Sequence, residues 1–166
     1  MIPPENFPSQ GGRVPKKLEI YSDGACSGNP GPAGIGVVIK KDGKVFKEIS
    51  KYIGEATNNI AEYTAIIYAA QEALIQQADE VALFTDSELA YNQMIGRYQV
   101  KDVKIKVLFD QVQHLASGFK VFVVTHVPRE QNKDADKLAR KAIKTEQAKV
   151  VASRQSPEDA QADLWG

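Results

Sequence analysis

The segment LEIYSDG, residues 18–24, decides the fold of this chain, because it predicts an apolar strand over residues 18–22 that ends at Asp23-Gly24. The segment GNPGP, residues 28–32, follows it and consists of turn-forming residues, which excludes regular structure there. Residues 35–41 are rich in β-branched side chains and predict a second strand. The dipeptide Asp42-Gly43 then indicates a hairpin turn into a return strand over residues 44–53.

The remainder of the chain predicts helices that alternate with strands. Helical spacing of apolar residues or closing glycines indicate helices over residues 57–77, 87–95, 104–116 and 132–144. Strands are expected over residues 80–85 and 119–125, and the second of these, FKVFVVT, has the continuous apolar pattern of a strand buried on both faces. Three adjacent strands followed by this alternation predict an α/β domain with a mixed sheet, antiparallel at its start and parallel afterwards.

Composition predicts one ordinary globular domain with two ends that differ from it. The 166 residues are 43% hydrophobic and 25% charged. Residues 1–16 carry four prolines and two glycines, and we expect a disordered N-terminal arm there, a domain over residues 17–145 and a flexible C-terminal tail over residues 146–166. The single cysteine, Cys26, excludes an internal disulfide framework. With no membrane-spanning run and no secretory signal in the sequence, we expect a cytoplasmic protein without a membrane partner.

The net charge of zero argues against a protein that binds nucleic acid mainly through phosphates, since such proteins are usually basic. Basic side chains nevertheless gather in two parts of the sequence. These are Arg97, Lys101, Lys104 and Lys106 in the first group, and Lys133, Lys137, Arg140, Lys141 and Lys144 in the second.

Acidic side chains stand at the ends of predicted elements in a way that favours a shared site. Asp23 and Asp86 each follow a predicted strand, at the sheet edge where open α/β sheets place their ligands. Glu62 and Asp136 lie early in two predicted helices, on or near the face that packs on the sheet. Each has a simpler explanation: Asp23 as a cap of the turn after its strand, Asp86 as a helix cap, Glu62 in a capping box with Asn59, and Asp136 as an acid favoured by the helix dipole.

Four carboxylates that converge would repel one another unless a cation compensates them. Hard oxygen ligands select magnesium or manganese, and a carboxylate cage that holds two such ions is typical of phosphoryl transfer. The sequence has no cysteine–histidine zinc spacing, no Walker loop and no Gly-x-Ser-x-Gly elbow.

Four motifs in this order resemble those of the type 1 ribonucleases H. They are YSDGAC (21–26) with GNPGPAGIG (28–36), TNN (57–59) with AEY (61–63), TDS (85–87), and VPRE (127–130) with Asn132, Ala135-Asp136 and Leu138-Ala139. The resemblance covers residues 18 to about 144 and implies the ribonuclease H-like fold, a five-stranded mixed sheet flanked by helices.

The resemblance implies an endonuclease that hydrolyses the RNA strand of RNA–DNA hybrids. Its catalytic and metal-binding acids would be Asp23, Glu62, Asp86 and Asp136, which would hold two Mg²⁺ ions, with Mn²⁺ as a substitute. Asp23 would bridge both ions; one ion would orient the attacking water and the other would stabilise the leaving 3′ oxygen, giving 5′-phosphate and 3′-hydroxyl ends.

Further residues acquire expected roles by the same resemblance. Substrate contacts are implied for Asn29, Asn58 and Asn59 in the minor groove, for Thr57 at a DNA phosphate, and for Glu88 where many members have a glutamine that contacts RNA. The asparagines could equally serve as turn and cap residues. His126, ten residues before Asp136, matches a catalytic histidine on a mobile loop, and its alternative is a loop histidine without a role.

The sequence also departs from the family pattern. Glu88 and Asp102 bring negative charge to two positions near the substrate, and residues 96–104 are too few for the basic protrusion of some members. No N-terminal hybrid-binding domain is expected. We therefore keep three alternatives to a monomeric hybrid-cleaving enzyme: a catalytically silent module that binds hybrid or protein, a nuclease that also cuts double-stranded RNA, and a domain excised from a polymerase.

Overall fold

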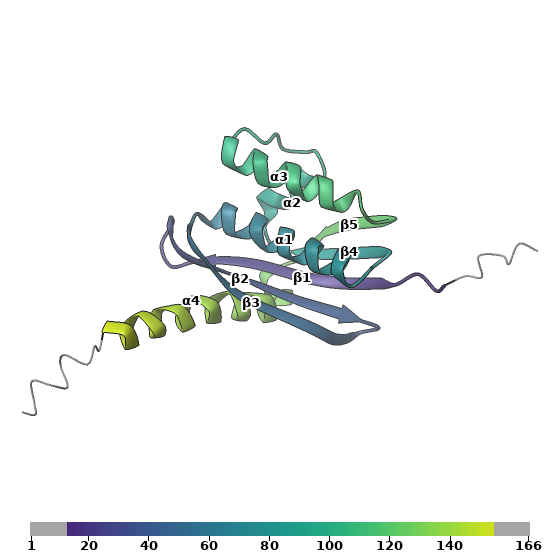
Figure 1. The fold of residues 1–166 in the computed structure, drawn as a ribbon. Helices are drawn as coiled ribbons and strands as arrows, with labels where there is room; N and C mark the ends of the chain where they lie inside the picture. The colour runs from purple at the N-terminus through teal and green to yellow at the C-terminus, as the bar shows by residue number, and fades with distance from the viewer. Residues whose placement is uncertain (1–12, 155–166) are drawn as a thin grey trace, which may run out of the picture.

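The structure, a computed structural model, describes residues 13–154 and contains one five-stranded mixed sheet (Figure 1). The strand order is β3-β2-β1-β4-β5, with β2 antiparallel to β1 and β3, and β4 parallel to β1 and β5. The predicted fold class is confirmed. In chain order the elements are β1 (Lys17–Cys26), β2 (Gly31–Lys41), β3 (Lys44–Ala56), α1 (Asn58–Ile75), β4 (Glu80–Thr85), α2 (Glu88–Met94), α3 (Val103–Ala116), β5 (Val121–His126), the 3₁₀ turn η1 (Arg129–Gln131) and α4 (Lys133–Arg154).

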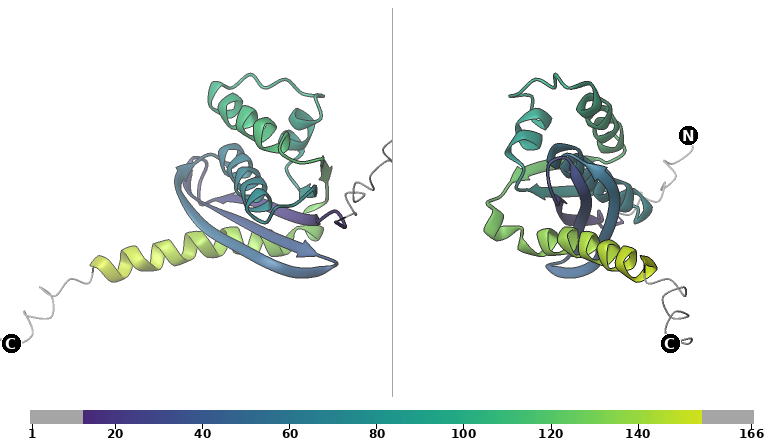
Figure 2. Two further views of the ribbon diagram at one scale, coloured as in Figure 1. Left: turned by 45° about the vertical axis from the view of Figure 1, so that its right-hand side comes forward. Right: turned by 90° about the vertical axis from the view of Figure 1, so that its left-hand side faces the viewer.

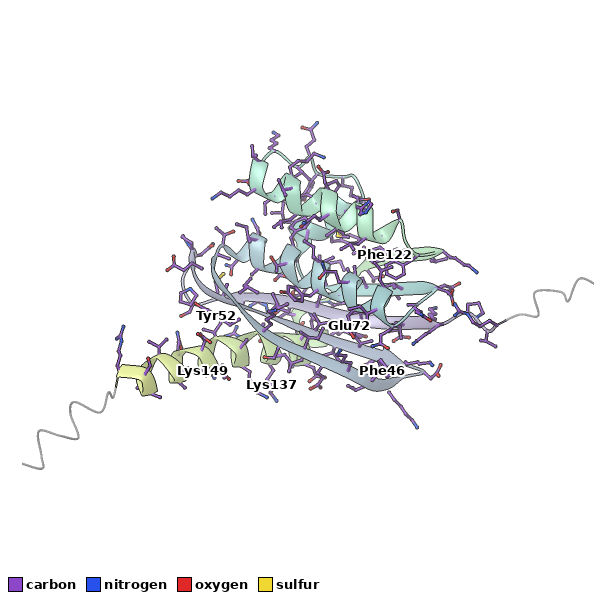
Figure 3. The ribbon with its side chains drawn as sticks, in the orientation of Figure 1. Phe46, Tyr52, Glu72, Phe122, Lys137 and Lys149 are labelled. Carbon is purple, nitrogen blue, oxygen red and sulfur yellow. The ribbon has the colours of Figure 1, made fainter. Side chains whose placement is uncertain are left out.

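Helices cover the two faces of the sheet unequally. Helix α1 packs on one face and carries α3 on its outer side, whereas α4 lies on the opposite face against β2, β3 and β1 (Figure 2). The main core fills the space between the sheet and α1. It includes the fully buried Leu18, Ile20 and Tyr63, and Phe122 of β5, labelled in Figure 3, packs against it.

Helix α4 approaches β2 so closely that only glycines fit between them. A Cβ atom on Gly36 would lie 1.9 Å from the carbonyl oxygen of Ala135, and one on Gly34 would lie 2.4 Å from that of Ala139. Such distances are far inside van der Waals contact. The two glycines therefore determine how closely α4 packs against the sheet, and with that the position of Asp136.

The prediction of a tail from residue 146 is wrong for its first part, because α4 continues without a break to Arg154. Residues 145–154 contain alanine, lysine, glutamine and glutamate, which sustain a helix without an apolar period.

Residues 155–166 and most of the expected N-terminal arm lie outside the described residues. At the inner end of that arm, Arg13 and Lys16 bond to Asp79, with an Arg13 Nη2–Asp79 Oδ1 distance of 2.8 Å. Strand β1 also continues past the expected stop at Asp23-Gly24 to Cys26, because it remains paired with β2.

The prediction that residues 119–125 are buried on both faces is also wrong. Strand β5 is an edge strand, and α4 does not reach across the sheet to cover it. Val121 and Val123 are consequently 42% and 50% exposed, while Phe122 and Val124 on the other face pack into the core. A continuous apolar run does not distinguish a central strand from an edge strand that has one face open.

Among the described residues, no helix is long and apolar enough to cross a membrane.

Replacing Gly36 with alanine should lower the free energy of unfolding by about 1–3 kcal/mol, the usual cost of overpacking, because α4 must move away from β2. The midpoint of urea unfolding measures this loss. Gly118→Ala is the control, since its added methyl would meet the end of the Leu74 side chain at 3.0 Å, which can move, and the Leu115 carbonyl oxygen only at 3.2 Å. Equal midpoints for the two variants would contradict the proposed role of the glycine contact.

Candidate active site

The parallel register of β1 and β4 brings two carboxylates to the same level of the sheet. Ser22 is the partner of Thr85, so that Asp23 and Asp86, one residue further along each strand, are neighbours. Asp86 does not cap α2, because Ser87 is the N-cap residue and its Oγ accepts a hydrogen bond from the Ala90 amide at 3.2 Å. The carboxylate of Asp86 is therefore available to the site.

Glu62 reaches the same place from α1. The helix can approach β1 because residue 24 is glycine: a Cβ atom there would lie 2.3 Å from the carbonyl carbon of Ala61. The N-cap of α1 is Thr57, whose Oγ1 accepts from the Ile60 amide at 3.3 Å, so the capping box of Asn59 and Glu62 is not what the structure contains. Carboxylate oxygens of Asp23, Glu62 and Asp86 all lie within 4.8 Å of one another.

Asp136 stands at the side of this group of three carboxylates. It lies in the first turn of α4 and lines the same cavity of approximately 580 Å³, but Arg140 Nε binds both of its carboxylate oxygens, at 2.9 and 3.1 Å. The beginning of α4 is fixed to β1 by buried Asn132, whose Nδ2 donates to the Ser22 carbonyl oxygen at 2.9 Å. Asp136 is thus close to the three acids and is neutralised by its own helix.

Without a bound cation, burial and mutual repulsion disfavour the ionised forms of the clustered carboxylates. Burial raises the pKa of Asp23, and the nearby charges of Glu62 and Asp86 raise it further. Burial likewise raises the pKa of Glu62, whose Oε2 is buried without a hydrogen-bond partner among the described residues. Arg129 Nε lies 3.9 Å from Asp86, but this side chain is 82% exposed and screened by water. An unpartnered buried oxygen among crowded carboxylates fits a hard divalent cation.

The predicted substrate residues lie beside the acids. Asn58 and Asn59 line the acid cavity, and Asn59 also lines a neighbouring cavity of approximately 680 Å³ together with Asn29 and Thr57. Asn29 has a structural contact as well, because its Oδ1 accepts from the Asn58 amide at 3.1 Å. Asp102, in the same neighbouring cavity, is the N-cap of α3 and accepts from the Ile105 amide, which explains an acid at this position.

Glu88 and His126 lie on the far side of Asp86 from the acid cavity. They line a separate hollow of approximately 450 Å³ with Tyr91 and Tyr98. His126 Nε2 is 3.3 Å from the backbone oxygen of Asp86, and its ring centroid is 5.7 Å from that of Tyr91. His126 therefore contacts the backbone that carries a catalytic candidate and does not line the cavity itself.

Basic and polar residues that the sequence did not assign to the site line the acid cavity. These are Arg129, Arg140, Lys144 and Gln147. The i, i+4 spacing of Asp136 and Arg140 is a signal that could have revealed their pair. The same i, i+4 spacing links Arg140 to Lys144, the last residue of the predicted helix. Gln147 could not have been found, because it lies in the part of α4 beyond the predicted end.

Comparison with known proteins gives a matching family model, similar curated proteins and similar solved structures. A family model described as "Reverse transcriptase-like" matches residues 21–142. Ribonuclease HI of Halobacterium salinarum is 40% identical over 137 residues, which are 82% of this chain and 67% of that protein. The bifunctional protein Rv2228c of Mycobacterium tuberculosis is 42% identical over 129 residues, which are 76% of this chain and 35% of that longer protein. The solved structure of LC11-RNase H1 in complex with an RNA/DNA hybrid is 44% identical, with a TM-score of 0.73 over 77% of this chain and 97% of that chain.

Without divalent metal, the thermal midpoint should fall as the pH rises above about 4, the range where unfolded carboxylic acids ionise. The pKa values of Asp23 and Glu62 are raised in the folded protein, so it binds more protons than the unfolded chain and loses stability with increasing pH. Asp23→Asn should flatten this decline and raise the midpoint at pH 8, and Mg²⁺ should raise the wild-type midpoint there.

Asp79→Asn is the control of opposite sign. A hydrogen bond from the Lys16 amide lowers the pKa of Asp79, so this variant should lose more stability at neutral pH than at acidic pH, where the folded carboxyl becomes protonated. Parallel curves of midpoint against pH for the wild type and Asp23→Asn would contradict the account of the cluster.

Proposed function

The chain belongs to the type 1 ribonuclease H (ribonuclease HI) family, and from this premise we propose that it is an endonuclease that hydrolyses the RNA strand of RNA–DNA hybrids by two-metal-ion catalysis. The observation that carries the proposal is the meeting of the carboxylates of Asp23, Glu62 and Asp86 within 4.8 Å. The products would carry 5′-phosphate and 3′-hydroxyl ends.

Two Mg²⁺ ions would be held by Asp23, Glu62, Asp86 and Asp136, with Mn²⁺ as an alternative. When bound, such ions activate water and stabilise the charge that develops on the leaving oxygen. The unpartnered Oε2 of Glu62 and the buried carboxylate of Asp23 supply the oxygen ligands that hard cations need.

The residues of this chain perform three tasks in the proposed reaction. The rigid contact of α1 with β1 at Gly24 fixes Glu62 relative to Asp23, which keeps the ligand set in place before metal arrives. Arg140 holds the Asp136 carboxylate at the rim of the cavity. Asn58 and Asn59 present amide groups beside the acids, where they can donate to and accept from a base edge or a 2′-hydroxyl group.

Further substrate contacts fall on both sides of the acids. Asn29 would contact the minor groove and Thr57 a phosphate of the DNA strand, and both line the neighbouring cavity with Asn59. Glu88 would lie along the RNA strand. His126 would assist the reaction by orienting the Asp86 backbone and by proton transfer during departure of the product. We propose that the protein acts as a monomer.

Asp23→Asn should reduce hybrid cleavage by more than about 10²-fold, because it removes a side chain that would bind the metal directly. Loss of a residue that only hydrogen-bonds to a metal ligand typically costs up to about 10²-fold. The assay uses an end-labelled hybrid, an RNA duplex and a DNA duplex, each with Mg²⁺ and with a chelator. Asp110→Asn is the control, since this exposed acid pairs with Lys106 on the surface of α3 and does not line the acid cavity. Metal-independent cleavage, or a hybrid left intact by the wild type, would overturn the proposal.

His126→Ala should lower kcat partially and leave KM nearly unchanged, because the side chain contacts the Asp86 backbone and lies outside the acid cavity. The loss should be near or below about 10²-fold, the lower end of the range for general acid–base catalysis, because His126 helps only the departure of the product. His114→Ala, an exposed histidine on α3, is the matched control. A kcat equal to that of the control would remove His126 from the mechanism.

A further inference from the structure

We propose that the trough face of α4, defined as Arg140, Lys144, Gln147 and Arg154, binds backbone phosphates of the nucleic-acid strand whose scissile bond enters the acid cavity. The identity of that strand as RNA rests on the proposed function. The contact itself requires only a polyanionic strand, and it assigns a task to the part of α4 that extends beyond the family match, which ends at residue 142.

The helix presents two different sides next to each other. Ala135, Ala139, Ala142 and Ile143 form its buried side against the sheet. Asp136, Arg140, Lys144 and Gln147 follow one another at i+4, i+4 and i+3, which is one continuous stripe of an α-helix, and all four line the acid cavity. Arg154 follows Gln147 by seven residues and continues that stripe outward.

The opposite wall of the cavity is the turn after β1 together with the start of α1. Cys26 is the last residue of β1, Ser27 begins the turn, and Asn58 and Asn59 belong to the helix. The acid cavity is therefore a trough with carboxylates at its floor and the polar stripe of α4 along one side. A strand that places a phosphate on the floor must pass along this stripe.

The C-terminal end of α4 extends past the sheet into solvent (Figures 1 and 2). The contact of Gly34 with Ala142 and Ile143 marks where β2 supports it, and residues 147–154 are all exposed. A helix end that packs on nothing gains little stability of its own in water. Its composition must therefore be explained by solubility alone or by something that it binds.

The charge on this part of the helix favours a phosphate ligand. Residues 137–154 carry six basic side chains and one acidic side chain, Glu146, in a chain whose net charge is zero. Lys144 forms no ion pair within the described part of the chain, whereas Arg140 is already paired with Asp136. Since the acid floor repels phosphates, a basic flank is needed to hold a strand there.

The stripe is long enough to contact several phosphates. Arg140 and Arg154 are 14 residues apart, which corresponds to roughly 21 Å along the helix axis at about 1.5 Å per residue. Gln147, between them, can donate a hydrogen bond to a phosphate oxygen without adding charge. The flank would thus contribute affinity without reading sequence.

Two matched pairs of variants test the proposal, each in the Asp23→Asn background to prevent cleavage. Gln147→Lys and Thr145→Lys each add one positive charge to exposed positions of α4, but only residue 147 lines the trough. Lys144→Ala and Lys149→Ala each remove one lysine, and Lys149, labelled in Figure 3, does not line the cavity. Binding of labelled hybrid, RNA duplex and DNA duplex is titrated between 50 and 200 mM salt.

Lys144→Ala should weaken binding by about two- to fivefold, the scale of one exposed charge pair, and lower the slope of log affinity against log salt by about 0.7–0.9. Gln147→Lys should tighten binding and steepen the slope. Thr145→Lys and Lys149→Ala should change both much less, because neither residue lines the trough and salt screens charges that do not contact the strand.

Equal effects within both pairs on every duplex would overturn the trough face as a binding surface. A change in sedimentation of the free protein that accounts for the effects would overturn it too, because the exposed Val150 and Val151 would then be mediating self-association. If the pairs differ on a duplex while wild-type protein leaves hybrid uncut, the trough face stands and the proposed function fails.

Discussion

The in-register parallel pairing of β1 with β4 is the constraint on which the site depends. It places Asp23 and Asp86 side by side, and a slip of one residue would turn one of them to the other face of the sheet. Two further close contacts then bring the remaining acids to that point: α1 against Gly24 for Glu62, and α4 against Gly36 for Asp136. Glycines where the helices pack on the strands allow the acidic side chains to come close together.

The sequence was sufficient to predict the fold class and the elements that carry the four acids. Strand β1 was evident from its apolar residues and the Asp-Gly that follows them, and α1 from its helical spacing, because burial of one face imposes a period on the sequence. The convergence of Asp23, Glu62 and Asp86 needed the motif pattern in addition, since each acid also had a capping explanation. The structure removes that explanation for Glu62 and Asp86 by placing Thr57 and Ser87 at the caps.

What escaped prediction depends on neighbours that local patterns do not contain. The apolar run of β5 gives no sign that α4 leaves one of its faces open, and the polar end of α4 gives no apolar period by which its length could be judged. The position of His126 beside the Asp86 backbone follows from its pairing with Thr85 at the end of β5, and that of Arg129 in the cavity from the path of the chain after β5. Loop direction of this kind is set by packing, and sequence spacing to Asp136 does not determine it.

The open face of β5 has a consequence for how the protein behaves at high concentration. Val121 and Val123 expose apolar surface on an edge strand, where a second molecule finds both a hydrophobic strip and unpaired backbone groups. Charge repulsion between molecules normally opposes such encounters, but the sequence pI is ≈ 6.7, so at near-neutral pH that repulsion is smallest. We therefore expect colloidal stability to be lowest close to neutrality, and a buffer one or two pH units away to restore the repulsion that keeps the β5 edges of two molecules apart.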